Sequence, residues 1–301
     1  MKNQIKLFYS KDWPDYELLD TGEGEKLERF GKYIFVRPYE DAVWPKTLSK
    51  KEWEMANGKF WSSKVGAKAG WKMSKGTFDT KWEMQYKGIK FLVSPTPFRN
   101  LGFFPEQASH WDFIETRLRQ GFDRQRKIKF LNLFGYTGVA SLFALRAGAE
   151  VTHVDASKQI LNWAKENEKL NSDQFTQGQS LRVIEDDVLK FLEREIKRGN
   201  KYDAVIMDPP KFGRGPKGEI WKIEEMLPKL LLAVRKVLSD KPLFVILTSY
   251  AIESSSLSLG YALADTMKNF KGNTEQGELC VLEKSNNRVI PLANTAVWSA
   301  N

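Results

Sequence analysis

The stretch that decides the fold is residues 128–155, IKFLNLFGYTGVASLFALRAGAEVTHVD. It begins with a short, nearly continuous apolar run, Ile128 to Leu133, which is typical of a buried strand in a parallel sheet. A turn with two glycines follows, and apolar residues then recur at the spacing of one helix face. A second β-like run ends on Asp155. This order predicts the opening of a parallel βαβ unit that binds a nucleoside-bearing cofactor.

The turn at residues 134–138 indicates which cofactor this is. A dinucleotide-binding turn has the pattern G-x-G-x-x-G, so that a pyrophosphate can lie against the helix N-terminus. Here only Gly135 and Gly138 occur, beside two bulky aromatic residues. This pattern disfavours a dehydrogenase and favours S-adenosylmethionine, which has no phosphate. Asp155, twenty residues after Gly135, is placed to accept hydrogen bonds from both ribose hydroxyls, although for the turn alone an ordinary strand-to-helix loop is the alternative.

A further carboxylate is expected where the third strand of the sheet ends. Leu181–Ile184 is predicted as that strand, and Glu185, Asp186 and Asp187 follow it. Because a carboxylate at the C-terminal end of a parallel strand faces the ligand crevice, Asp187 is a candidate partner for the adenine amino group of the cofactor, with Asp186 as the alternate. The alternative for either residue is an acidic N-cap of a helix over residues 188–198.

The stretch DPPKFGRG, residues 208–215, follows a fourth predicted strand, Tyr202–Met207. Two successive prolines stiffen the backbone and remove two N–H donors, which leaves carbonyl groups to point at a ligand. Asp208 and a fixed carbonyl can accept hydrogen bonds from the amino group of a base, and Phe212 can stack on the ring of that base. Lys211 and Arg214 can hold a backbone phosphate. The predicted catalytic residues are Asp208, Pro209, Pro210, Lys211 and Phe212.

The remaining pattern predicts an α/β fold with a seven-stranded Rossmann-like sheet in which one strand is reversed. After the fourth strand we expect a helix over Ile220–Leu238, a strand over Leu243–Thr248 and a helix over Ser256–Phe270. An antiparallel pair, residues 278–283 and 288–298, is expected to close the sheet.

The N-terminal third differs in composition. Residues 1–95 are predicted as a small, basic, β-rich domain and residues 96–301 as the cofactor-binding domain, with Pro95 and Pro97 at the boundary. Residues 44–100 carry twelve Lys and Arg against four acidic residues, and five of the ten tryptophans lie there. These are Trp44, Trp53, Trp61, Trp71 and Trp82.

Two interpretations of this basic, aromatic stretch remain open. Lysine and arginine bind phosphates without sequence preference, and aromatic faces stack on unpaired bases. Alternatively, the tryptophans fill the core of the small domain and the lysines solvate its outside. We favour the core for the tryptophans and contact with a polyanion for the charge.

The composition argues against several other classes of protein. The single cysteine, Cys280, excludes an internal disulfide framework and any cysteine-rich metal site, and it fits a reducing cytosol. With only His110 and His153 present, no metal site is expected either. No signal peptide or membrane-spanning stretch is apparent, so we expect a cytoplasmic protein, and its net charge of +9 points towards polyanions.

Together these motifs resemble the class I S-adenosylmethionine-dependent methyltransferases, and more narrowly the bacterial family that contains the large-subunit rRNA cytosine methyltransferases. The resemblance spans about residues 98–300, and GFFPEQ (102–107) resembles the segment that covers the cofactor in that family. It is carried by LNLFGYTG (131–138), VTHVDASK (151–158), DDVLKFL (186–192) and YDAVIMDPPKF (202–212). The cofactor-binding residues it implies are Phe104, Gln107, Phe134, Gly135, Tyr136, Thr137, Gly138, Asp155, Ala156, Asp187, Val188 and Asp208.

One departure from the family pattern concerns the reaction. Methylation of carbon 5 of cytosine requires a thiolate, and in the related enzymes the cysteine follows the fifth strand, where this chain has LTSYAIESSS (247–256). Cys280 lies in an apolar run and is expected to be a buried small hydrophobe. We therefore expect direct in-line transfer to an acceptor with its own lone pair, in ribosomal RNA. The alternatives are a protein or small-molecule methyltransferase and a non-catalytic RNA-binding or ribosome-assembly factor.

Overall fold

The computed structural model describes residues 4–61, 69–74, 79–121, 127–250 and 255–301, and the chain forms two compact units. The large unit contains Met1–Phe8, Ser109–Leu279 and Leu292–Asn301, and the small unit contains Tyr9–Ala108 and Cys280–Pro291. The division into two domains between residues 95 and 96, which the sequence suggested, stays a prediction. In the folded chain, each of the two units combines segments from separate parts of the sequence.

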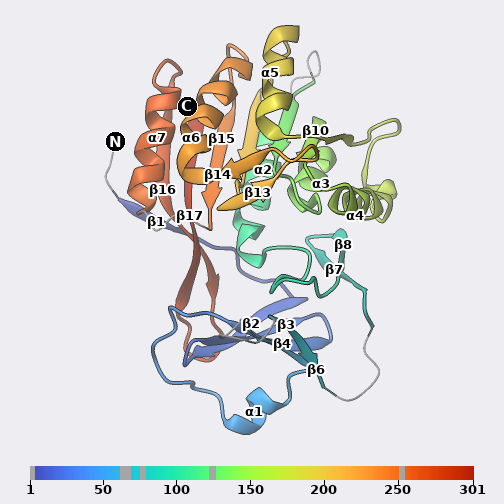
Figure 1. The fold of residues 1–301 in the computed structure, drawn as a ribbon, viewed down its shortest axis with the longest axis vertical. Coiled ribbons are helices and arrows are strands. Elements are labelled where there is room, and N and C mark those ends of the chain that lie inside the picture. Colours follow the sequence, from blue (N-terminus) through green and yellow to red (C-terminus); the bar gives the residue numbers. More distant parts are fainter. Residues whose placement is uncertain (1–3, 62–68, 75–78, 122–126, 251–254) are drawn as a thin grey trace. The chain divides into compact units, whose positions relative to one another are not determined.

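The large unit is built on one mixed sheet with the strand order β1-β16-β17-β15-β12-β9-β10-β11 (Figure 1). Strands β9, β10, β11, β12 and β15 are parallel, and β17 runs antiparallel to β15. The strands are β1 (Ile5–Phe8), β9 (Lys129–Leu133), β10 (Glu150–Asp155), β11 (Arg182–Glu185), β12 (Ala204–Met207), β15 (Phe244–Ser249), β16 (Gly272–Leu282) and β17 (Val289–Ala300). The predicted α/β fold is confirmed.

The number of strands was underestimated. The described residues form eight strands in this sheet rather than seven, because β1 pairs in parallel with β16 at its edge. Strand β1 has only four residues, and three of them are exposed. Such a short edge strand lacks the alternation of buried and exposed positions by which strands are recognised in a sequence.

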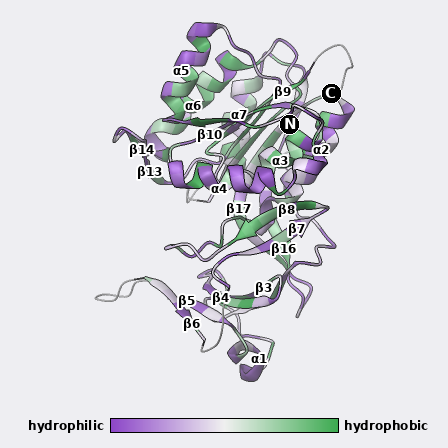
Figure 2. Cartoon of the chain, turned by 90° about the vertical axis from the view of Figure 1, so that its right-hand side faces the viewer, coloured by the Kyte–Doolittle hydropathy of each residue, from purple (hydrophilic) through white to green (hydrophobic). Residues whose placement is uncertain are grey.

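Helices cover both faces of this sheet (Figure 2). A hydrophobic core joins α5, α6 and α7 to the central strands. On the other face, the Trp111 ring of α2 stacks on the Phe143 ring of α3 with centroids 5.7 Å apart. Ser157 caps α4, as predicted. The helices are α2 (Ala108–Gln120), α3 (Val139–Arg146), α4 (Lys158–Lys169), α5 (Val188–Arg198), α6 (Ile223–Val237) and α7 (Ser256–Met267), with a 3-10 turn at Ser172–Gln174. In the described part of the chain we find no helical segment with the length and hydropathy needed to span a bilayer.

The predicted helix over Ile220–Leu238 begins later than expected. Its first residues form β14 (Ile220–Lys222), which pairs with β13 (Phe212–Arg214) as a separate antiparallel hairpin, and α6 starts only at Ile223. Residues 220–222 are exposed, buried and exposed in turn, which is the period of a strand. The glycine- and proline-containing turn before them returns the chain to β13.

The small unit is rich in strands, as predicted, and its sheet has the order β2-β3-β4-β5-β6. The predicted hairpin is confirmed as β7 and β8, which pair from Trp82↔Val93 to Tyr86↔Ile89. The elements are β2 (Tyr16–Gly22), β3 (Glu25–Phe30), β4 (Tyr33–Pro38), α1 (Lys50–Glu54), β5 (Gly58–Trp61), β6 (Gly70–Met73), β7 (Trp82–Tyr86) and β8 (Ile89–Val93).

The five tryptophans of the basic stretch divide between core and surface. Trp53 and Trp82 are buried, with 7% and 8% of their surface exposed, so the core interpretation is right for these two. Trp44 and Trp71 are half-buried, and Trp61 is 50% exposed. The core interpretation is therefore wrong for Trp61, whose ring lies under the Lys59 ammonium group at 4.6 Å.

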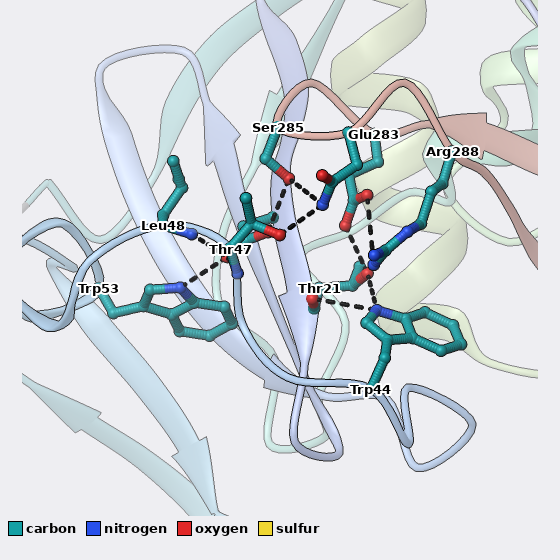
Figure 3. Close-up of polar contacts among 10 residues, drawn as sticks. Thr21, Trp44, Thr47, Leu48, Trp53, Glu283, Ser285 and Arg288 are labelled. Atoms are coloured by element: carbon teal, nitrogen blue, oxygen red, sulfur yellow. Dashed lines mark hydrogen bonds and ion pairs between the residues drawn. The ribbon is translucent and has the colours of Figure 1, made fainter.

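Buried Asp20 on β2 joins three segments of the small unit, and its partners Thr47, Trp53 and Ser285 are labelled in Figure 3. One carboxylate oxygen accepts hydrogen bonds from the backbone N–H groups of Thr47 and Leu48, at 3.0 and 2.9 Å, and from the Trp53 indole at 3.0 Å. The other oxygen accepts a 2.6 Å hydrogen bond from the Ser285 hydroxyl. Ser285 lies in the turn between β16 and β17, so this turn is fixed within the small unit.

A second buried carboxylate, Glu28 on β3, is surrounded by donors. It accepts two 2.6 Å hydrogen bonds from the Arg37 guanidinium and one of 2.8 Å from the Tyr16 hydroxyl, and the Lys26 ammonium group lies 3.3 Å away. Burial acts to raise the pKa of Glu28, but the positive charges of Arg37 and Lys26 outweigh burial and lower it to about 2. The carboxylate is therefore ionised at neutral pH and depends on its partners.

We expect Arg37→Met to destabilise the protein by about 3–5 kcal/mol, because it leaves the ionised Glu28 without its main partner in the interior. The double variant Arg37→Met/Glu28→Gln should recover part of this loss, because the orphaned charge is then removed. Urea unfolding of the full chain measures both values. Lys50→Met, in which an exposed lysine loses a surface ion pair, should cost less than about 1 kcal/mol, and an equal loss for Lys50→Met and Arg37→Met would contradict the expectation.

Candidate functional site

Four parallel strands, in the order β12-β9-β10-β11, end side by side in the large unit. Backbone hydrogen bonds continue past their ends: Asp208 N–H donates to the Leu133 carbonyl at 3.4 Å, Gly135 N–H to Val154 at 3.0 Å, and the N–H of residue 186 to the Asp155 carbonyl at 3.1 Å. We call the residues that follow these strands, 134–138, 155–157, 186–188 and 208–212, the carboxyl edge. The chain proceeds from β9 to β10 on one side and returns to β12 on the other, so the switch point where α/β sheets bind ligands lies at β9.

The turn after β9 has an unusual backbone. Phe134 and Tyr136 adopt left-handed φ angles of +57° and +52°, and Gly138, at +87°, is the N-cap of α3. A left-handed non-glycine residue costs about 1–3 kcal/mol and persists only where its surroundings hold it. A Cβ atom on Gly135 would overlap the His153 ring, and one on Gly138 would lie 3.1 Å from the Ala164 side chain. The glycines are thus required for the turn to lie flat against β10 and α4.

A buried chain of hydrogen bonds supports the turn from below. The Asn132 amide donates to the Ser141 hydroxyl at 2.9 Å, and Ser141 contacts His153 Nδ1 at 3.0 Å. His153 Nε2 lies 3.2 Å from the Tyr136 carbonyl, which can only accept, so Nε2 carries the proton and Nδ1 accepts from Ser141. Burial lowers the pKa of His153 to about 4. The neutral imidazole therefore positions the Tyr136 peptide, a role that sequence analysis missed because it considered His153 only as a metal ligand.

Helix α4 supports the other half of the turn. The side-chain amide of Asn167, fully buried, donates a 2.9 Å hydrogen bond to the Thr137 carbonyl. Asn167 is in turn fixed by Asn171, whose amide donates to the Asn167 carbonyl at 2.7 Å. Two consecutive carbonyl groups, of Tyr136 and Thr137, are thus drawn towards the interior.

The turn and the end of β10 are joined by Asp155. One oxygen of its carboxylate accepts from the Tyr136 N–H at 3.1 Å and the other from the Ser157 N–H at 2.9 Å. Burial raises the pKa of Asp155, although the N–H groups of Ser157, Tyr136 and Ala156 act to lower it. A carboxylate offers about four lone-pair sites. With three N–H groups directed at it, the carboxylate retains capacity for about one further donor, which fits a hydroxyl of a ribose.

The acids after β11 have local partners. Asp187 is the N-cap of α5, and its Oδ1 accepts from the Lys190 N–H at 3.0 Å. The helix-cap interpretation is therefore right for Asp187, and it engages one of the two carboxylate oxygens. Asp186 accepts from the Asp187 N–H at 2.9 Å and forms an ion pair with Arg194. Contact of Asp187 with adenine, and of buried Val188 with the cofactor, stays a prediction.

The residues predicted to be catalytic follow β12. Asp208 and Pro209 directly follow β12, which pairs with β9, so both lie at the switch point. Asp208 is half-buried and Pro209 is buried. The carbonyl of Pro210, however, accepts a 2.7 Å hydrogen bond from the Trp221 indole. The expectation that the proline pair leaves its carbonyl groups for a ligand is therefore wrong at Pro210, because the returning strand β14 brings a donor to it. Next along the chain are Lys211 and Phe212, whose side chains are exposed.

The remaining predicted features come from other segments of the chain. Phe104 precedes the 3-10 turn Pro105–Gln107, and both Phe104 and Gln107 belong to the small unit. Their closure over the cofactor stays a prediction. Residues 251–254, within the serine-rich stretch after β15, lie outside the described residues. Within the described ranges, no cluster of three or more His, Cys, Asp or Glu side chains is arranged to hold a metal ion.

Comparison with known sequences identifies relatives. The family model for S-adenosylmethionine-dependent methyltransferases matches residues 65–253. The ribosomal RNA large subunit methyltransferase K of Neisseria meningitidis is 27% identical over 282 residues, which cover 86% of this chain and 74% of that protein. The ribosomal RNA large subunit methyltransferase I of Aeromonas salmonicida is 34% identical over 131 residues, 43% of this chain. This chain covers only 30% of the Aeromonas protein.

Solved structures give a similar result. A crystal structure of a SAM-dependent methyltransferase from Agrobacterium tumefaciens superposes with a TM-score of 0.91 at 38% sequence identity, covering 98% of this chain and 94% of that one. A second crystal structure, complexed with SAH, superposes with a TM-score of 0.71 at 16% identity, covering 96% of this chain and 76% of that one. At this lower identity the likeness concerns the fold.

We expect Asp155→Ala to weaken the binding of S-adenosylhomocysteine by about 10- to 100-fold, because a hydrogen bond to a charged group contributes about 1.5–3 kcal/mol. Isothermal titration calorimetry measures this affinity, and thermal melting verifies that the variant is folded. Asp240→Ala, at an exposed position between α6 and β15, should bind as the wild type does. Equal affinities for all three proteins would contradict the assignment of Asp155.

We expect stability to fall as the pH is lowered from about 6.5 to about 4. An unfolded histidine takes up a proton near pH 6.5, whereas folded His153 does so only near pH 4. The contribution of neutral His153 to the free energy of unfolding is therefore complete above pH 6.5 and is lost as the pH falls towards 4. This loss is about 3 kcal/mol, at 1.36 kcal/mol per pH unit. Buried His110, whose pKa is lowered to about 3 by burial, acts in the same direction. In His153→Gln the slope of unfolding free energy against pH should be shallower by one proton, and an unchanged slope would contradict a neutral His153.

Proposed function

The chain belongs to the S-adenosylmethionine-dependent methyltransferase family, and we propose that it methylates a nucleotide of ribosomal RNA by direct in-line transfer. Two relatives support RNA as the substrate, since the Neisseria and Aeromonas proteins both carry the name ribosomal RNA large subunit methyltransferase. The twelve lysines and arginines against four acidic residues in residues 44–100 offer charge for a polyanion.

The observation that carries the proposal is the placement of two carboxylates on either side of β9. Asp155 ends β10 on one side, and Asp208 follows β12 on the other. With the ribose of the cofactor on Asp155, the opposite side of the switch point is left for the acceptor. A methyl donor and an acceptor held at the ends of the two strands that flank β9 are close enough for transfer within one site.

The chemistry asks little of the protein besides alignment. Bound S-adenosylmethionine supplies a methyl group on a sulfonium sulfur, which keeps the electron pair of the broken bond as the lone pair of the acceptor forms the new one. Asp208 and the Pro209 carbonyl would accept hydrogen bonds from an acceptor amine or hydroxyl and so turn its lone pair towards the methyl group. Asp208 would also take up the proton that the acceptor loses, and exposed Phe212 would stack on the base.

Direct transfer is supported by the state of the only cysteine. Attack on a pyrimidine ring requires an accessible thiolate, and Cys280 is 1% exposed within β16. A thiol buried among apolar neighbours is inert rather than nucleophilic. The acceptor is therefore an atom with its own lone pair: a ring nitrogen, an exocyclic amine or a hydroxyl.

We expect one methylated nucleoside to be missing from ribosomal RNA of cells that lack this gene, as measured by nucleoside mass spectrometry. Wild-type protein and Cys280→Ala should restore it, and Asp208→Ala should not, because Asp208 orients the acceptor. Immunoblotting verifies equal amounts of each protein.

Each other outcome has a definite meaning. An unchanged spectrum would contradict RNA as the substrate and favour a protein or a metabolite. Restoration by Asp208→Ala would favour a non-catalytic assembly factor, and failure of folded Cys280→Ala would contradict direct transfer.

A further inference from the structure

The residues predicted to bind the methyl acceptor, Asp208 to Pro210, are followed by a hairpin outside the main sheet (Figure 1). Its two strands, β13 and β14, form three cross-strand pairs, of which the middle one is Gly213↔Trp221. The two outer pairs, Phe212↔Lys222 and Arg214↔Ile220, lie on the opposite face, because successive residues of a strand point to opposite sides. We call these the inner face and the outer face of the hairpin.

The inner face ties the hairpin to the cofactor turn. Trp221 is 4% exposed, and its ring meets that of Phe134 with centroids 4.8 Å apart. The same indole donates to the Pro210 carbonyl at 2.7 Å. At the base of the hairpin, the Ile223 N–H donates to the Lys211 carbonyl at 3.1 Å. The hairpin is thus held in a fixed place beside the turn.

The tip of the hairpin is held by helix α5. The Glu219 carboxylate accepts a 2.6 Å hydrogen bond from Lys190 of α5 and a 2.9 Å bond from the Lys217 N–H. The Lys190 ammonium group lowers the pKa of Glu219 to about 2, so the acid stays ionised. Lys190 lies three residues after Asp187, the cap that is predicted to meet adenine.

The outer face presents apolar and cationic side chains in alternation. Phe212 and Ile220 are 55% and 56% exposed and lie on one diagonal, while exposed Arg214 and Lys222 lie on the other. Lys222 also forms a 3.0 Å ion pair with exposed Glu225, which a phosphate would have to displace. Residues 211–222 contain four lysines and arginines against one acid, Glu219, which is engaged by Lys190. A rigid, cationic face with two exposed apolar side chains complements a chain of phosphates that also displays base faces.

We propose that the outer face of this hairpin binds an unpaired stretch of the RNA substrate beside the acceptor nucleotide. Ile220 lies against the face of a flanking base, and Arg214 and Lys222 contact the phosphates on either side. An unpaired strand is favoured over a duplex because only unpaired bases expose their faces to apolar side chains. The inference rests on the proposed function and adds to it the segment that holds the substrate.

The test uses the purified full chain and fluorescence anisotropy with two labelled probes. One is a single-stranded RNA of mixed sequence and about twelve nucleotides, within the usual range for such surfaces, and the other is the same RNA as a duplex. The variants are Arg214→Gln/Lys222→Gln and Ile220→Thr, which keeps a β-branched residue in the strand. The matched controls lie on the exposed side of α6, Lys229→Gln and Leu232→Ser.

We expect the charge variant to lower the slope of log affinity against log salt by about 1.4, since each lost phosphate contact on a single strand contributes about 0.7. Ile220→Thr should weaken single-strand binding by about three- to tenfold, from the apolar area it no longer buries, and leave duplex binding unchanged. Both controls should match the wild type. All proteins should bind S-adenosylhomocysteine equally, which verifies that the turn and the fold are intact.

The two proposals fail in different ways. Wild-type protein that binds S-adenosylhomocysteine but neither RNA would overturn RNA as the substrate, and the hairpin inference with it. Wild-type protein that binds the single strand while both variants bind equally well would overturn the hairpin inference alone. Loss of duplex and single-strand affinity to the same extent in Ile220→Thr would overturn the contact with a base.

Discussion

The site depends on one close contact, that of the His153 ring with the backbone of Gly135. Because Gly135 has no side chain, the turn after β9 lies directly on the imidazole, which donates to the Tyr136 carbonyl at 3.2 Å. This leaves the Tyr136 N–H directed at Asp155, where it donates at 3.1 Å. The left-handed residues, the buried histidine and the acid that is to receive a ribose are therefore parts of one arrangement, and a change in any of them is transmitted to the others.

Much of this arrangement can be predicted from short local patterns in the sequence. The parallel strands are short apolar runs, and the turn residues, Asp155 and Ser157 follow them at fixed offsets, so topology alone brings them together. The support of His153 by Ser141 and Asn132 could not be predicted, since these residues meet only through the pairing of β9 with β10 and the packing of α3. The same holds for Trp221, whose indole reaches Pro210 only after the hairpin has formed.

Two of the departures from expectation, the start of α6 and the number of strands in the large sheet, have a common physical origin. Residues 220–222 were assigned to α6 because Ile223 onwards has a helical pattern, and three residues are too few to show the period of a strand against it. Strand β1, with four residues, could not be predicted for the same reason. Short strands are stabilised by their partners rather than by their own pattern, as the turn 215–219 and strand β16 show.

The pairing of β1 with β16 has a consequence for how the chain is made. It joins Ile5 to Gln276, so the outermost strand of the large sheet leaves the ribosome 271 residues (276 − 5) before its partner. Until then the segment IKLF has no neighbour in its sheet, and an apolar strand without a neighbour is a template for intermolecular association. Closing so long a loop adds only a modest entropic cost, because that cost grows with the logarithm of loop length. Completion of the sheet therefore waits until β16 has been synthesised, and its timing is governed by translation rather than by local folding.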